Sequence, residues 1–203
     1  MHAKLHTSFL VRLSSSVSTN NLCTPDSVWH SSITSSPALN DWLFDQGSLT
    51  QRLSALCHVC FTVQPLNEGW QTLSLDECSA LNIAPHSIGW VREVFLCNGN
   101  QPWVFARSVA GQAELLHADF DLSHLGNRSL GQLLFPQQAF SRGALQICYL
   151  PVTQLPTLAQ QHTMGRQQLW ARRSCFKKES LGVLVAEVFL PKLWQDTDPT
   201  LLD

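Results

Sequence analysis

The chain has 203 residues, of which 44% are hydrophobic and 14% are charged, and its formal net charge at pH 7 is −2. This length and hydrophobic content suit one domain with a substantial core, and the near-neutral charge argues against nucleic acid or an anionic membrane as the main partner. We also expect no membrane span, because no apolar run approaches the roughly 20 residues that a spanning helix needs.

The first 36 residues differ in composition from the rest of the chain. They are rich in serine, and no acidic residue precedes Asp26. We interpret residues 1–36 as a disordered N-terminal tail, with a transit peptide or a translation start placed too far upstream as alternatives. The folded domain is expected over residues 37–196, and residues 197–203 are expected to form a short C-terminal tail.

Two short helices are predicted at the start of the domain. Apolar residues recur at helical spacing over residues 38–44, and a second helix begins at Ser48, with Gln51 three residues later as in a capping box. This second helix carries Leu49, Leu53 and Leu56 on one side.

A strand then follows, with Val59, Phe61 and Val63 in alternation, and we expect it to end at Pro65. The clearest signal is a hairpin of residues 90–97 and 103–109, because aromatic and β-branched residues flank the turn sequence Asn98-Gly99.

The rest of the chain is predicted to contain further helices, followed by strands. A helix is expected over residues 112–125 with Gly126 just past its end, and a helical turn over residues 129–135. Strands are expected at 145–150, 169–176 and 183–190. The order of helices and strands predicts an α+β domain with one antiparallel sheet.

Seven cysteines, an odd number, and the absence of a visible secretory signal favour reduced thiols in a cytoplasmic protein. Cys57 and Cys60 have the spacing of metal ligands, but structural zinc normally takes four ligands and no second such pair occurs. No nucleotide-binding or nucleophile motif is present either. We therefore expect neither a metal nor another cofactor.

Charged residues inside apolar strands are the candidates for chemistry. Burial of an isolated charge costs several kcal/mol, so each must face water, pair with another charge or line a ligand cavity. The large apolar neighbours of Arg92 and Glu187 weaken the first explanation for these two, although an internal salt bridge stays possible. Arg107, Arg172 and Arg173 also lie in apolar strands, and the same three explanations apply to them.

The strand residues also resemble a known family. The stretch WVREVFLC at 90–97 with Pro102-Trp103, GNRSLG at 126–131, LWARRS at 169–174 and EVFLP at 187–191 resemble the chorismate pyruvate-lyase family in identity, order and spacing. The resemblance covers residues 38–194. The segment 64–70, apart from Glu68-Gly69, and the serine-rich N-terminus fit poorly, and neither is expected to touch the site.

The resemblance implies a six-stranded antiparallel sheet with helices on one side and two helical flaps that enclose a ligand cavity. It implies cleavage of chorismate to 4-hydroxybenzoate and pyruvate, the first committed step of ubiquinone synthesis, without a cofactor. We expect a monomer whose partner is this small molecule. We also expect slow product release and product inhibition, because product and substrate share contacts.

The family's roles transfer residue by residue. Arg92 matches the arginine that holds the ring carboxylate, and Glu187 matches the glutamate that reaches the ring hydroxyl at the other end. Leu130 and Leu49 match backbone contacts to the ligand. The family's best-known member has methionine at the position of Leu49, a difference that a main-chain contact tolerates. The second carboxylate of chorismate needs a further cation, for which Arg107, Arg172 and Arg173 are candidates.

Two alternatives remain. Ligand-sensing domains of some bacterial transcription regulators resemble this fold, and fold alone does not decide activity. Such regulators carry an N-terminal helix-turn-helix, for which residues 1–37 are too short and too rich in serine. The other alternative is a degenerate lyase that binds 4-hydroxybenzoate without turnover, although Arg92 and Glu187 are both present.

Overall fold

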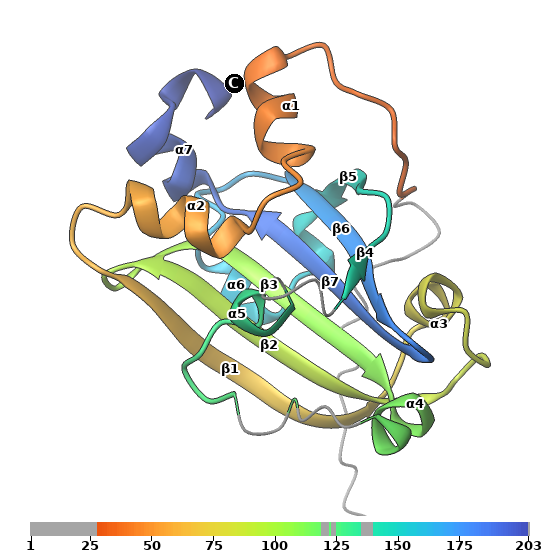
Figure 1. The fold of residues 1–203 in the computed structure, drawn as a ribbon. Helices are drawn as coiled ribbons and strands as arrows, with labels where there is room; N and C mark the ends of the chain where they lie inside the picture. Colours follow the sequence, from red (N-terminus) through yellow and green to blue (C-terminus); the bar gives the residue numbers. More distant parts are fainter. Residues whose placement is uncertain (1–27, 119–121, 123–124, 135–139, 203) are drawn as a thin grey trace, which may run out of the picture.

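The computed structural model describes residues 28–118, 122, 125–134 and 140–202. Within this part of the chain, one antiparallel sheet of seven strands forms the centre of the molecule (Figure 1). The strands are β1 (Phe61–Thr72), β2 (Ile88–Asn98), β3 (Gln101–Gly111), β4 (Ser141–Arg142), β5 (Gln146–Pro151), β6 (Gln168–Lys178) and β7 (Leu181–Phe189). The helices are α1 (Pro37–Leu43), α2 (Leu49–Leu56), α3 (Leu75–Leu81), α4 (Gln112–His117), α5 (Gly131–Leu134), α6 (Thr157–Gln160) and α7 (Pro191–Thr197), with 3₁₀ turns η2 (Val152–Gln154) and η3 (Pro199–Leu202).

The strand order is β1-β2-β3-β7-β6-β4, with β5 also paired to β6. The predicted α+β class with one antiparallel sheet is confirmed, but the expected count of six strands differs from the seven observed among the described residues. The reason is that two short strands share the outer edge of β6. β5 pairs with residues 168–173 and β4 pairs with Phe176 and Lys177.

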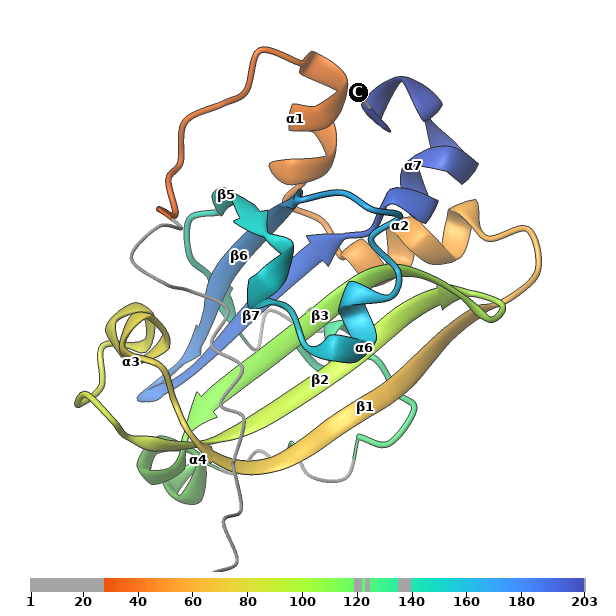
Figure 2. The same cartoon turned by 180° about the vertical axis from the view of Figure 1, so that it is seen from behind.

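Helices cover both faces of the sheet, which corrects the expectation of helices on one side. Alternate residues of β2 are buried on each face, so both faces need cover. One face, which carries Val94 and Leu96, packs against α1, α2 and α7; we call it the cavity face. On the opposite face, Phe95 packs with α6 and Val91 packs with α3, and Figure 2 shows α6 in front of the sheet.

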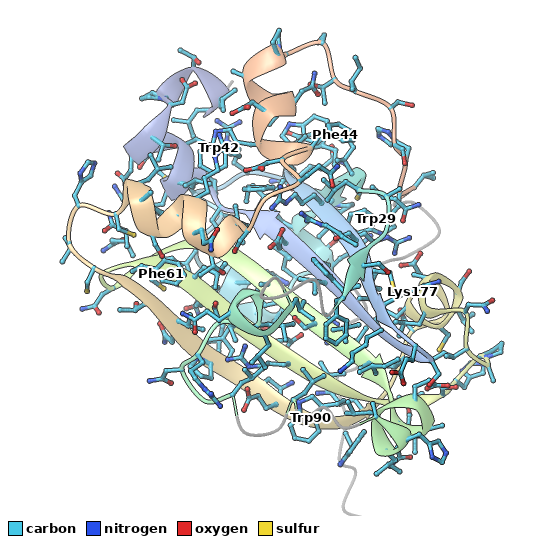
Figure 3. All side chains as sticks on the ribbon, viewed as in Figure 1. Trp29, Trp42, Phe44, Phe61, Trp90 and Lys177 are labelled. Atoms are coloured by element: carbon cyan, nitrogen blue, oxygen red, sulfur yellow. The ribbon has the colours of Figure 1, made fainter. Side chains whose placement is uncertain are left out.

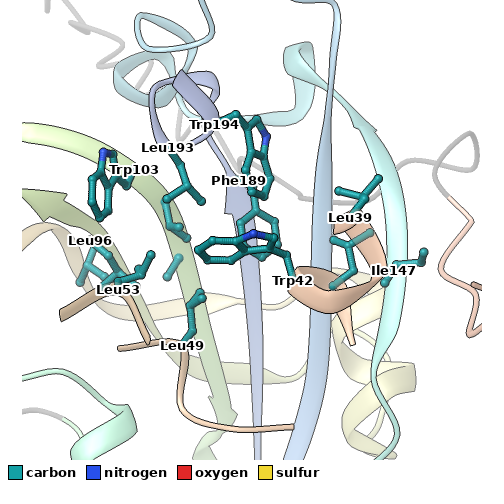
Figure 4. Close-up of a cluster of buried hydrophobic side chains, with 14 of the residues drawn as sticks. Leu39, Trp42, Leu49, Leu53, Leu96, Trp103, Ile147, Phe189, Leu193 and Trp194 are labelled. Atoms are coloured by element: carbon teal, nitrogen blue, oxygen red, sulfur yellow. The ribbon is translucent and has the colours of Figure 1, made fainter. Parts of the chain in front are cut away.

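An aromatic cluster anchors α1 and α7 to the cavity face (Figure 4). Trp42 of α1 meets Trp194 of α7 edge to face at 5.4 Å between ring centroids, and Phe189 of β7 stacks on Trp194 at 5.3 Å. Such pairs contribute beyond the area that they bury. Leu201 and Leu202 of η3 also pack against this cluster, so the segment expected to be a C-terminal tail lies against the core.

The N-terminal part of the chain is described only from Val28 onward, nine residues before the expected domain boundary. His30 pairs with Ile147 of β5 through two backbone hydrogen bonds of 3.0 and 2.7 Å, and Trp29 packs against the face opposite the cavity. The rest of the expected tail, residues 1–27, lies outside the described residues.

Several predicted elements differ in extent from the observed ones. β1 does not end at Pro65 but continues to Thr72, because β1 is an edge strand and a register shift after Pro65 absorbs its missing N–H. The helix expected over 112–125 ends at His117, and residues 119–121 and 123–124 lie outside the described part. Gly126 adopts a φ of 51°. Helix α3, with a complete capping box of Ser74 and Glu77, was not predicted.

Candidate active site

A pocket opens on the cavity face, between the sheet and the short helices α2 and α5. Trp42 and Trp90 lie toward opposite ends of this face (Figure 3). The space inside the pocket, counting the part that opens to solvent, is about 520 Å³. Its lining comprises Ser48, Leu49, Thr50, Val63, Arg92, Val94, Leu96, Ala106, Ser108, Ser129, Leu130, Gly131, Leu134, Arg142, Phe176, Val185 and Glu187.

The sequence motifs thus bring four predicted site residues together, since Leu49, Arg92, Leu130 and Glu187 all line this pocket. Arg92 pairs with Ser108 across β2 and β3, while Glu187 pairs with Ala106 across β3 and β7. β2 and β7 therefore lie on either side of β3, and the partners of Arg92 and Glu187 on β3 are two residues apart. With the usual spacings between and along strands, the Cα atoms of Arg92 and Glu187 are about 12 Å apart. An arginine and a glutamate separated in this way leave room for a ring between them.

Arg92 is buried, with 3% of its surface exposed, and three hydrogen bonds hold its guanidinium. Nε donates to Glu68 at 2.5 Å, and Nη2 donates to the carbonyls of Gly126 and Arg128 at 2.6 and 3.1 Å. Glu68 is one of the two residues of segment 64–70 that fit the resemblance, and its contact with Arg92 corrects the expectation that this segment does not touch the site. β1 pairs Glu68 with Arg92 directly, so Glu68 lies beside any ligand carboxylate that binds Arg92.

Glu187 forms an ion pair with Arg172, whose Nε donates at 2.6 Å. Arg172 has no exposed surface, and its Nη1 donates to the carbonyls of Trp42 and Asp45 at 2.8 and 3.1 Å. Within the described residues, Nη2 of Arg172 has no hydrogen-bond partner. Arg172 does not line the pocket, so its role is to position Glu187 and to neutralise it from behind.

Arg107 and Arg173 lie on the face opposite the cavity face and do not line the pocket, which corrects their assignment as candidates for a second carboxylate. Adjacent strand residues point to opposite faces, so Arg173 cannot share a face with Arg172. Arg107 donates to Glu77 at 2.7 Å and to Glu93 at 2.8 Å. Burial works against the charge of Arg107, but these two carboxylates raise its pKa.

Arg173 is held in the same way, by ionic contacts on that face. It donates to the carboxylate of Asp76 and, at 2.9 Å, to the side-chain oxygen of Gln146. Its guanidinium carbon also lies 4.5 Å from the ring centroid of Trp29. These partners explain both strand arginines as parts of a buried ionic layer without a ligand.

Two pocket residues were missed by the sequence reasoning. Arg142 lines the pocket from β4, and nothing in its local sequence marks a two-residue strand. Ser129 also lines the pocket; its hydroxyl is buried and has no hydrogen-bond partner among the described residues. Buried polar groups without a partner are rare, so this hydroxyl is a candidate contact to a ligand.

The helices over the pocket approach each other closely at Gly131, the first residue of α5. A Cβ atom at Gly131 would lie 3.2 Å from both Ser48 Oγ and Thr50 Oγ1. Ser48 is the N-cap of α2, and its Oγ accepts from the backbone of Gln51 at 3.4 Å, which confirms the predicted helix start. The hydroxyl of Ser48 is therefore not free to move aside without loss of the cap.

Replacement of Gly131 by alanine is accordingly expected to separate the start of α2 from α5. We expect ligand affinity to fall by about tenfold, because the pocket wall moves outward, while stability changes by about 1 kcal/mol or less. Ligand titration of the G131A variant, beside thermal unfolding, checks this. Alanine in place of Gly165 is the control: its Cβ would meet nothing within 4 Å, so its only cost is backbone strain at a φ of 76°, away from the pocket lining. Equal effects of the two changes on affinity would contradict the expectation.

No site for a metal is evident in the described part of the chain, where no three His, Cys, Asp or Glu side chains are grouped to hold an ion. Cys57 and Cys60 carry free thiols. Burial raises the pKa of the Cys97 thiol to about 11 and also raises that of Cys57, which disfavours the thiolate that metal binding or nucleophilic attack requires. Nor does any helix of the described residues have the length and apolar character needed to cross a membrane.

Comparison with known proteins gives matches over most of the chain. Residues 25–198 match the family model described as chorismate lyase. A protein named "Probable chorismate pyruvate-lyase" from Pseudomonas aeruginosa (strain UCBPP-PA14) is 56% identical over 159 residues, which are 78% of this chain and 86% of that protein. "Probable chorismate pyruvate-lyase 2" from Pseudomonas entomophila (strain L48) is 57% identical over 155 residues, 76% of this chain and 81% of that one.

Among solved structures, the effector-binding domain of the trehalose repressor of Bacillus subtilis is similar with a TM-score of 0.49 and 10% sequence identity. The match covers 64% of this chain and 90% of the repressor domain.

Proposed function

The chain belongs to the chorismate lyase family, and we propose that it is a chorismate pyruvate-lyase, which converts chorismate into 4-hydroxybenzoate and pyruvate. The observation that best supports this reaction is the placement of Arg92 and Glu187 at separate points of one largely apolar pocket. A ring acid with a hydroxyl group opposite its carboxylate presents the two groups that such a pair would bind. The proposal extends to the first committed step of ubiquinone synthesis as the place of the reaction.

Chorismate carries its ring carboxylate and its ring hydroxyl at opposite ends of a six-membered ring. We assign the carboxylate to Arg92, whose planar guanidinium forms two parallel hydrogen bonds with a carboxylate. Glu187 accepts from the ring hydroxyl with the oxygen lone pairs that Arg172 does not occupy. Backbone groups of Leu49 and Leu130, on α2 and beside α5, are the proposed further contacts, and these helices act as flaps over the ring.

The chemical step breaks the bond between the ring and the enolpyruvyl oxygen, and the ring carbon that bears the hydroxyl loses its hydrogen. The ring becomes aromatic, so the reaction is strongly downhill, and the departing enolpyruvyl methylene gains a hydrogen to give pyruvate. This hydrogen moves either directly within the substrate or through Glu187 as base. In both routes, the protein contributes mainly by holding a reactive conformer between matched charges.

The same contacts predict slow release of the product. 4-Hydroxybenzoate retains both the carboxylate for Arg92 and the hydroxyl for Glu187, whereas pyruvate retains neither. We therefore propose product inhibition, with opening of the wall formed by α2 and α5 as the slow step.

The direct test mixes the purified full-length protein with chorismate and follows 4-hydroxybenzoate and pyruvate by chromatography. We expect equal amounts of both products, and the same rate after treatment with a chelator. If 4-hydroxybenzoate binds tightly but chorismate is not consumed, the lyase proposal is wrong. That result would instead favour an effector-binding domain or a lyase that has lost turnover.

A further inference from the structure

The second carboxylate of chorismate needs a cationic partner in this pocket, and the identity of that partner rests on the proposed function. The enolpyruvyl group is attached to the ring carbon next to the one that bears the hydroxyl. If Arg92 holds the ring carboxylate and Glu187 holds the hydroxyl, the enolpyruvyl carboxylate must lie on the Glu187 side of the pocket. The cation that meets it must therefore come from the part of the sheet formed by β7, β6 and β4.

Arg142 occupies this side of the pocket. It lies on β4, where it pairs with Phe176 of β6, and its guanidinium carbon is 5.2 Å from the Phe176 ring centroid. Its Nε donates to Ser174 Oγ at 2.9 Å. Ser174 pairs with Val185, which shares the cavity face with Glu187 two residues further along β7. Arg142 and Glu187 therefore line the same end of the cavity.

The other arginines of the sheet are excluded by their positions. Arg107 and Arg173 lie on the opposite face in contact with carboxylates. Arg172 shares the face, but it is fully buried behind Glu187 and does not line the pocket. Of the three candidates given by sequence, none reaches the cavity, whereas Arg142 does.

Backbone carbonyls and a hydroxyl fix the position of the Arg142 guanidinium. Its Nη1 donates to the backbone carbonyls of Asp45, Gln46 and Gly47 at 3.3, 2.9 and 3.2 Å. These carbonyls and the Ser174 hydroxyl hold the guanidinium at this end of the cavity. The loop that they belong to leads directly into α2, which bears Leu49 over the pocket.

The electrostatic surroundings of Arg142 also favour binding of an anion. Burial and the charge of Arg172 lower the pKa of Arg142, and Glu187 and Asp45 offset this only in part. A guanidinium stays protonated in proteins, so a lowered pKa marks a cation that an added negative charge would stabilise. A carboxylate brought into the pocket would supply that charge.

We propose that Arg142 binds the enolpyruvyl carboxylate of chorismate and is the residue by which this pocket distinguishes the doubly charged substrate from singly charged 4-hydroxybenzoate. Arg92 and Glu187 touch groups that substrate and product share. Arg142 touches a group that leaves with pyruvate. Its loss must therefore affect the substrate far more than the product.

The test compares wild type with Arg142→Gln and Arg142→Lys in two measurements on the full-length chain. One is kcat/KM for chorismate, and the other is the Kd of 4-hydroxybenzoate from tryptophan fluorescence. For Arg142→Gln, we expect kcat/KM to fall roughly 10- to 100-fold, as for a lost hydrogen bond to a charged group, and Kd to change by less than about threefold. Arg142→Lys keeps the charge and is expected to recover part of the loss.

The matched control is Arg166→Gln, because Arg166 lines a separate surface depression with Tyr149 and Trp194 and is expected to leave both values unchanged. An equal fall in chorismate and 4-hydroxybenzoate binding would show that Arg142 only supports the loop before α2, and would overturn the proposal. So would an unchanged kcat/KM in Arg142→Gln. If Arg142→Gln does not fold, Arg142→Lys takes its place in the same comparison, and a loss of 4-hydroxybenzoate affinity as large as the loss of kcat/KM for chorismate would overturn the proposal.

These outcomes are separable from failure of the proposed function. If the wild type forms no product, the lyase assignment fails, and binding of chorismate is then compared with binding of 4-hydroxybenzoate. Selective loss of chorismate binding in Arg142→Gln would still support the assignment of Arg142. Equal binding of chorismate to both proteins would overturn it.

Discussion

Replacement of Arg92 by alanine is expected to lower kcat/KM for chorismate by two to three orders of magnitude. Arg92 is buried, and its removal deletes the cation for the ring carboxylate and leaves Glu68 without its partner. Truncation of one member of a buried charge pair, here Arg92 with the ligand carboxylate in the pocket, costs about 2–5 kcal/mol; Glu68 is exposed to water and adds little to this cost. Because the product carries the same carboxylate, the Kd of 4-hydroxybenzoate should rise by a similar factor. Steady-state kinetics and fluorescence titration measure the two effects.

The control for Arg92→Ala is Glu68→Gln. This variant keeps an acceptor for Arg92 Nε but removes the carboxylate that competes with the ligand. We expect its affinity for 4-hydroxybenzoate to stay equal or to increase, whereas Arg92→Ala weakens binding. The two variants thus separate loss of the ligand contact from loss of the ion pair. Normal product affinity in Arg92→Ala would contradict the assignment of Arg92.

The β2–β3 hairpin and the helix start at Ser48 could be predicted because their signals are local. Alternating aromatic and β-branched residues around Asn98-Gly99 specify a hairpin, and Ser48 with Gln51 specifies a cap. Helix α3 carried a signal of equal quality, since Ser74 and Glu77 form a complete capping box. Helix α3 could therefore also have been predicted from the sequence.

The sequence of β2 also contains the reason why both faces of the sheet are covered. β2 alternates Arg92, Val94 and Leu96 with Val91, Phe95 and Cys97, so large apolar residues point both ways. A strand that is apolar on both sides is buried on both sides. Helices were therefore required on each face.

The site was predictable where strand alternation decides it. Because successive side chains of a strand point to opposite faces, Arg172 and Arg173 must lie on opposite faces of β6. The position of Arg142 was not predictable in this way, because β4 has two residues and its place depends on pairing with β6, over 30 residues further along the chain. The role of Glu68 was hidden for a similar reason, since a register shift after Pro65 sets its pairing with Arg92.

Replacement of Glu187 by alanine should have the largest combined effect on activity and stability. Arg172 would keep its carbonyl partners but lose the one carboxylate that it contacts at 2.6 Å. Breaking a buried ion pair in this way costs about 3–5 kcal/mol of unfolding free energy. We also expect at least a hundredfold loss of kcat, whether Glu187 orients the hydroxyl or takes the hydrogen from the ring carbon that bears it. Urea unfolding and single-turnover kinetics measure the two losses.

A paired variant separates the two roles of Glu187. The double change Arg172→Met with Glu187→Leu removes both charges and keeps similar volumes, and well-packed apolar replacements of a buried ion pair are often neutral in stability. We therefore expect the double variant to regain most of the stability that Glu187→Ala loses, with activity still absent. Should turnover return together with stability, Glu187 would serve only to neutralise Arg172, and its contact with the ring hydroxyl would be wrong.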